Sequence, residues 1–118
     1  MSSWGHGHFE DADALDYVDD LIHKLAAELD RASGKRRLPG DEVLSRCVPR
    51  LAVLALLVKG TGTVGIEETR LARWREACRT GFDRDAGDIY DRPADARRRW
   101  RVIERTFKEL TERIDVKS

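Results

Sequence analysis

Apolar residues recur every three or four positions through two long stretches of this chain, and that period is typical of one face of an α-helix. The first stretch, residues 11–31, has its apolar stripe at Leu15, Val18, Ile22, Leu25 and Leu29. The second stretch, residues 93–115, has its stripe at Ala96, Trp100, Ile103, Phe107, Leu110 and Ile114. It begins at Pro93, where proline suits the first turn. Both patterns predict amphipathic helices that bury one side.

A third helix is predicted over residues 41–59, with Asp41 as its N-cap. Every residue from 51 to 58 is apolar, so we expect this helix to be the central and most buried one. If that run lay on a surface instead, it would indicate a homodimer interface. Pro49 interrupts the pattern and is expected to kink the helix, because its ring displaces the carbonyl of Ser45.

A fourth helix is predicted over residues 66–80, with Leu71, Trp74 and Cys78 on its inward side. We expect Gly81 to end it. The acidic segment that follows, residues 83–88, begins like a calcium-binding loop. The glycine and glutamate that such a loop requires are absent at positions 88 and 94, so a turn-forming connector is predicted instead.

These patterns predict an all-α chain of 118 residues in one domain, with four main helices in a compact bundle. An N-terminal arm, residues 1–10, is expected to pack on that bundle. Trp4 and Phe9 supply large apolar surfaces for contact with helix ends, while Gly5 and Gly7 allow a tight path. A chain of this length buries roughly two thirds of its unfolded surface, so it needs neither disulfides nor metal to form a core.

The formal net charge is zero, but the charges are unevenly distributed. The first 30 residues carry eight acidic side chains against the single base Lys24, whereas residues 31–60 carry seven bases against two acids. This asymmetry indicates either pairing inside the fold or a surface that steers a charged partner. Pairing inside the fold is the more economical interpretation.

Acidic side chains and one histidine share the face of helix 11–31 that lies opposite the apolar stripe. The candidate partner-binding residues on this helix are Asp13, Asp16, Asp19, Asp20 and His23. They favour a non-enzymatic protein-binding module whose partner has a basic surface, such as an immunity or antitoxin-like protein bound to a toxin domain. The alternative is a solvated helix face with ordinary pairs four residues apart.

Catalytic motifs are missing from the sequence, which has no Gly-rich phosphate loop, Ser-His-Asp set or His-Glu-x-x-His. No cofactor is therefore predicted. A small metal-dependent hydrolase using His6, His8, Asp16 and His23 is the alternative function. Two imidazoles are too few for a structural zinc site, and the two cysteines lack finger-like spacing, so no metal site is predicted. Stoichiometric metal after chelation would favour the hydrolase.

A basic segment near the C-terminus, residues 97–105, suggests nucleic-acid binding. Trp100 falls on the apolar stripe, however, and glutamates interleave with the arginines, so nucleic acid is not an expected partner. The longest apolar run is too short to cross a bilayer, and no signal segment opens the chain. A cytoplasmic location is expected, with the thiols of Cys47 and Cys78 reduced.

The segment from Trp4 to Asp16 resembles the opening of a family of small bacterial proteins, domain-of-unknown-function family 4259. Members typically begin Trp-Gly-x-Gly-x-Phe-Glu-Asn-Asp-x-Ala-x-Asp. The matching residues are Trp4, Gly5, Gly7, Phe9, Glu10, Ala14 and Asp16. The departures are His8, where the family usually has proline, Asp11 in place of asparagine, and Ala12 in place of aspartate. The resemblance covers about the first sixteen residues. It implies a bacterial helical protein and brings no established activity or ligand.

Overall fold

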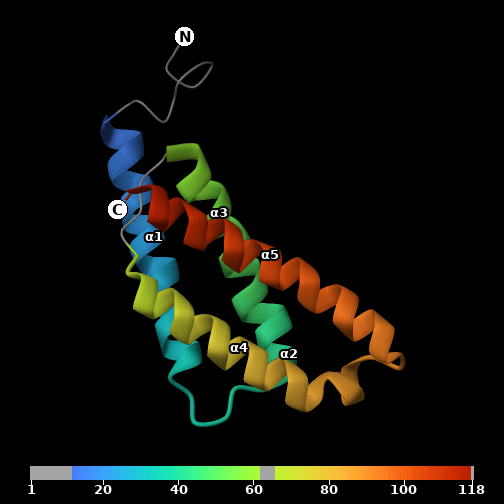
Figure 1. Ribbon diagram of the computed structural model, residues 1–118. Helices are drawn as coiled ribbons and strands as arrows, with labels where there is room; N and C mark the ends of the chain where they lie inside the picture. Colours follow the sequence, from blue (N-terminus) through green and yellow to red (C-terminus); the bar gives the residue numbers. More distant parts are fainter. Residues whose placement is uncertain (1–11, 62–65, 118) are drawn as a thin grey trace.

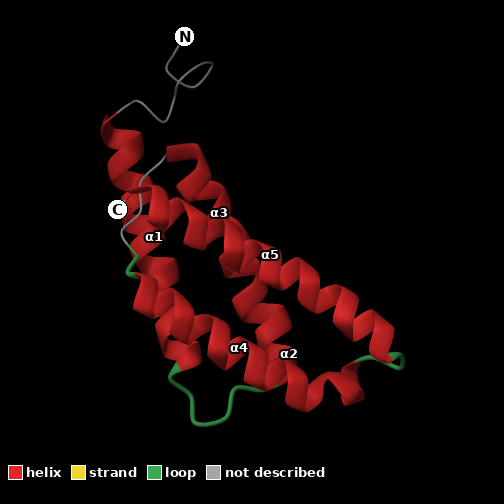
Figure 2. Cartoon of the chain, in the orientation of Figure 1, coloured by secondary structure: helices red, strands yellow, loops and turns green. Residues whose placement is uncertain are grey.

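The computed structural model describes residues 12–61 and 66–117, and within them all regular structure is helical (Figure 2). In chain order the elements are α1 (Ala12–Ser33), α2 (Gly40–Glu42), the π-helical segment η2 (Val43–Cys47), α3 (Val48–Thr61), α4 (Glu68–Ile89) and α5 (Pro93–Lys117). This confirms the predicted all-α class. The predicted packing of the N-terminal arm, with Trp4, Gly5, Gly7 and Phe9, lies outside the described residues.

Four long helices surround one core (Figure 1). α2, η2 and α3 follow one another without a break, so residues 40–61 form one continuous helix. α1 packs against α3 and α4, and α5 packs against the same two helices from the other side. Each apolar stripe that the sequence predicts therefore faces two neighbouring helices.

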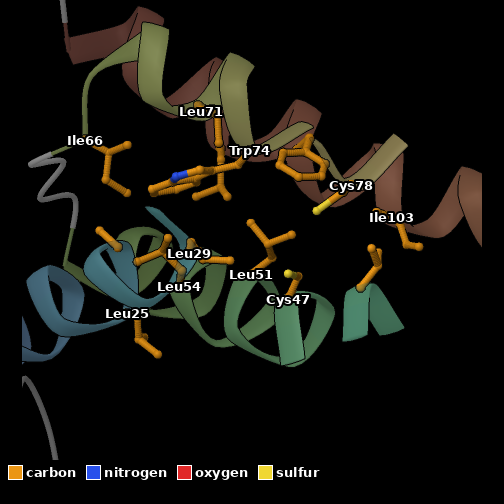
Figure 3. Packing of buried hydrophobic residues seen from close by; sticks show 14 of the residues in the cluster. Leu25, Leu29, Cys47, Leu51, Leu54, Ile66, Leu71, Trp74, Cys78 and Ile103 are labelled. Carbon is orange, nitrogen blue, oxygen red and sulfur yellow. The ribbon is translucent and has the colours of Figure 1, made fainter. Parts of the chain in front are cut away.

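The core is built from large side chains that every long helix contributes (Figure 3). α1 contributes Ile22 and Leu29, and α4 contributes Trp74, all of them fully buried. Trp100 and Phe107 of α5 are also buried, which confirms that Trp100 belongs to the apolar stripe. Burying an aromatic or large aliphatic side chain contributes about 1.5–3 kcal/mol, so these residues dominate the stability of the fold.

The disturbance expected at Pro49 takes the form of a π-helical turn. Proline has no backbone N–H, so the carbonyl four residues earlier, on Ser45, loses its donor and the ring crowds it. Ser45 lies within η2, where the N–H of Val48 donates to the carbonyl of Val43, five residues earlier. The wider turn accommodates the ring without breaking the helix.

Gly81 does not end a helix, and that prediction is wrong. α4 continues to Ile89, so residues 83–88 are helical and not a turn-forming connector. A Cβ atom built at Gly81 would lie 2.5 Å from the carbonyl oxygen of Leu38. Gly81 is therefore required by the close approach of the chain before α2, and its backbone remains helical.

The predicted central helix has only one buried side. Leu51, Leu54 and Val58 of α3 are buried in the core, as expected. Val53 and Leu56 are 42% and 69% exposed, however, so the expectation that α3 is the most buried helix is wrong on that side. The described neighbours of α3 are α1, α5 and η2, and they cover only the side that faces the core.

Candidate functional site

The candidate residues form a continuous surface along the N-terminal half of α1. Spacings of three and four residues place Asp13, Asp16 and Asp20 on one side of the helix, with Asp19 and His23 beside them. Asp13, Asp16, Asp20 and His23 are exposed and Asp19 is partly exposed. We call this set, together with Tyr17, the acidic surface of α1.

Two carboxylates of the acidic surface, Asp16 and Asp20, are not neutralised by the described residues. Asp16 and Asp20 form no ion pair or hydrogen bond with any residue in the described part of the chain, and Asp20 does not pair with Lys24, four residues away on the helix. Asp19 is paired, because its Oδ2 lies 3.5 Å from Nδ1 of His23. Both side chains of that pair are about half exposed.

The other end of α1 uses its carboxylates differently. Glu28 accepts hydrogen bonds from Nε and Nη2 of Arg50 in α3, at 3.1 and 2.9 Å. The hydrogen bond from Arg50 is the main reason why the pKa of Glu28 lies below its ordinary value. The predicted internal pairing of opposite charges is therefore realised at this end, whereas Asp16 and Asp20 remain outside it.

Asp30 joins α1 to α4 through hydrogen bonds from three residues of α4. Its carboxylate accepts hydrogen bonds from Nε1 of the buried Trp74 at 2.8 Å and from Nη2 of Arg70 at 2.6 Å. Nη2 of Arg73 adds a longer contact of 3.4 Å. Burial opposes ionisation of Asp30, but the bonds from Arg70 and Trp74 outweigh it and lower the pKa of the carboxyl.

Sequence reasoning missed Tyr17, which lies between the aspartates and is 71% exposed. Exposed aromatic side chains are enriched at the energetic centres of protein interfaces. The signal was available: Tyr17 is one residue away from Val18 on the apolar stripe and shares the face of Asp13, Asp16 and Asp20. The acidic surface therefore combines charge with one aromatic contact.

Arg97, Arg98 and Arg101 of α5 form no ion pair with Asp16, Asp19 or Asp20 in the described part of the chain. Nη1 of Arg98 lies 3.9 Å from Asp95 of its own helix. Arg97 and Arg101 line a hollow between α4 and α5 together with Trp100. The guanidinium of Arg79 lies over the Trp100 ring, 4.9 Å from its centroid, so that aromatic face is already covered.

Two residues of the alternative metal site, Asp16 and His23, lie within the described residues. His6 and His8 lie outside the described residues. Within residues 12–61 and 66–117, no group of three or more His, Cys, Asp or Glu side chains is placed to hold a metal ion. His23 faces the single carboxylate of Asp19. No helix in this part of the chain is long and apolar enough to span a bilayer.

Comparison with known proteins adds no further assignment. No protein-family model matches this chain, and neither the curated proteins nor the solved structures contain a match. The resemblance of the segment Trp4–Asp16 to domain-of-unknown-function family 4259 therefore stays a prediction.

Proposed function

We propose that this chain is a non-enzymatic protein-binding module that recognises a basic partner through the acidic surface of α1, as an immunity or antitoxin-like protein would. The observation that carries the proposal is the contrast between the two ends of one helix. Glu28 and Asp30 are engaged by arginines of other helices, while Asp16 and Asp20 have no partner among the described residues. A basic partner would supply the missing neutralisation.

Repulsion within the acidic surface supports this interpretation. Asp16 and Asp20 are four residues apart on α1, and like charges at that spacing destabilise a helix by about 0.2–0.5 kcal/mol. The helix dipole favours carboxylates in the first turn only, and Asp19 and Asp20 lie beyond it. Their presence is unfavourable for α1 by itself, and a cationic partner would relieve the repulsion.

Recognition of this kind has defined physical properties. Exposed charges act over about 8 Å at physiological ionic strength, so they accelerate encounter and make it sensitive to salt. Tyr17 would add an aromatic contact at the edge of the acidic surface, and removal of an aromatic hot-spot side chain costs about 2 kcal/mol or more of binding free energy. Charge would therefore govern the association rate and Tyr17 the lifetime of the complex.

The test is capture of a partner from a lysate of the native organism, followed by binding measurements with the purified pair. The triple variant Asp16→Asn, Asp19→Asn, Asp20→Asn should lose the partner and slow its association. The matched control Asp88→Asn, Asp91→Asn, Glu109→Gln changes the net charge equally at exposed positions elsewhere and should retain it. Tyr17→Ala should mainly accelerate dissociation.

Equal capture by the triple variant and its control would refute the proposal. So would a triple variant that loses stability while it still binds normally, because the aspartates would then be structural. The circular dichroism of each variant establishes that α1 is folded before binding is compared.

A further inference from the structure

The two cysteines face one another across the contact between η2 and α4. Cys47 ends η2, Cys78 lies on the buried side of α4, and both are free and almost fully buried. Figure 3 shows the two sulfur atoms between these elements, pointing toward each other. Neither thiol has a role in the acidic surface of α1.

The chain at the start of α2 approaches α4 closely, one turn from Cys78. Cβ atoms built at Gly40 and Gly81 would lie 3.1 Å from the carbonyl oxygen of Gly81 and 2.5 Å from that of Leu38, respectively. Gly81 is one helical turn from Cys78 on α4. These contacts hold the start of the helix that carries Cys47 against the turn of α4 next to Cys78. The two thiols themselves are close enough to share a hydrogen bond, which is the proximity that a disulfide needs.

A solvent cavity of about 140 Å³ reaches Cys47 from the side of α1. Its charged lining consists of Arg31, Lys35, Arg46 and Arg50 against Glu28 and Glu42. A cavity of this size holds several water-sized molecules, and its excess of cations favours a thiolate over a thiol. Hydrogen bonding with the Cys78 thiol, opposed by burial and assisted by Arg50, lowers the pKa of Cys47. The same contact, together with burial, raises the pKa of Cys78.

We propose that Cys47 is a peroxide-reactive thiol and that Cys78 resolves its oxidised form, so that oxidation links η2 to α4 through a reversible disulfide. The location fits, because π-helical turns occur frequently at functional sites. Cys47 is the attacking residue since it alone of the two lines the cavity.

The chemistry needs hydrogen peroxide as its only co-reactant. The Cys47 thiolate attacks one peroxide oxygen, the O–O bond breaks, and hydroxide leaves with the thiol proton as water, giving a sulfenic acid. The Cys78 sulfur then attacks the Cys47 sulfur, the S–O bond breaks, and a second water leaves with the Cys78 proton. Two thiols are oxidised to one disulfide, and one peroxide is reduced to two waters.

The test is a tryptic map of the full chain after peroxide treatment under native conditions. Cleavage at the neighbouring arginines releases the segments 47–50 and 76–79, and these should be joined to each other and separate on addition of dithiothreitol. The folded state is verified by circular dichroism before digestion. Disulfides between chains, or irreversible sulfinic acid at either cysteine of the folded protein, would overturn the proposal.

Variants assign the two roles. Cys78→Ser should stop at a mono-oxygenated Cys47, whereas Cys47→Ser should leave Cys78 unmodified over the same period. Arg50→Gln should slow oxidation about three- to tenfold, because its guanidinium favours the thiolate. Arg36→Gln, exposed and outside the cavity, should not change the rate. Equal rates for both arginine variants, or faster oxidation at Cys78 than at Cys47, would contradict these roles. The wild-type map remains decisive even if a cysteine variant fails to fold.

Discussion

Two glycines of α4 should respond to the same substitution with opposite signs. Gly81→Ala places a methyl group 2.5 Å from the carbonyl oxygen of Leu38 and 3.3 Å from Cγ2 of Val43. At Gly87 the same methyl group meets no atom within 4 Å. Both positions are inside α4, so the change in helix propensity is the same at each and only the surroundings differ.

The magnitudes follow from these surroundings. Replacing glycine by alanine in a helix interior gains about 0.8–1.0 kcal/mol, so Gly87→Ala should raise the free energy of unfolding by up to about that amount. At Gly81 the Leu38 carbonyl cannot move freely, because Nη2 of Arg84 donates to it at 2.6 Å. Overpacking costs about 1–3 kcal/mol, and after the propensity gain a net loss of up to about 2 kcal/mol is expected for Gly81→Ala.

Urea unfolding of the wild type and both variants, followed by circular dichroism, measures the two effects. The midpoints should shift in opposite directions with an unchanged slope, since the surface exposed on unfolding is the same. Stabilisation by Gly81→Ala would show that the close contact with Leu38 is absent in solution. Destabilisation by Gly87→Ala would show that residues 83–88 are not helical there.

Three further predictions rest on the same structure. Asp30→Ala should lower the free energy of unfolding by about 2 kcal/mol, because it leaves the buried indole N–H of Trp74 without its acceptor. Asp83→Ala removes an exposed pair with Arg79 and should cost at most about 0.5 kcal/mol. Equal losses of the two variants in urea unfolding would refute this prediction. The pKa of Asp30 is lower in the folded state than in the unfolded state. The contribution of its carboxylate to the free energy of unfolding should therefore be complete above the unfolded-state pKa of about 4 and disappear as the pH falls through the folded-state pKa. The stability difference between wild type and Asp30→Asn should be constant from about pH 5 to 8 and shrink in acid. Leu54→Asp should abolish cooperative unfolding, because it buries an unpaired carboxylate. Leu56→Asp should change the stability of a monomer little, because Leu56 is exposed. A large loss of stability at Leu56 would mean that the exposed side of α3 is covered in solution.

The apolar stripes were sufficient to predict the helices, because burial of one face is a property of local sequence period. α5 begins at Pro93 as predicted, and Trp100 is buried as its position on the stripe required. Gly81 misled the prediction because glycine is read as a helix end when only its local preference is considered. Glycine is needed at position 81 because the chain at Leu38 passes close to it. Leu38 lies 43 positions earlier in the sequence, so local patterns do not encode this contact.

The ion pairs of the candidate site also depend on contacts between residues far apart in the sequence, which the sequence alone did not reveal. Composition located the excess of acidic residues in the first 30 positions but could not say which of them meet arginines. That depends on which helices pack together: Glu28 reaches Arg50 because α1 lies beside α3, and Asp30 reaches Arg70 because it lies beside α4. Tyr17 was overlooked since an aromatic side chain next to an apolar stripe is usually assigned to the core.

The two halves of α1 differ in whether their carboxylates meet arginines, and this difference makes the binding proposal testable. Carboxylates that meet arginines inside the fold fix how α1 packs, and losing them should change stability. Asp16 and Asp20 have no such partner among the described residues, and they repel one another along the helix. Neutralising the acidic surface should therefore leave the stability unchanged or slightly raised, by up to about 0.5 kcal/mol, while recognition is lost. Residues that serve the fold cannot show that combination, since their removal lowers the free energy of unfolding.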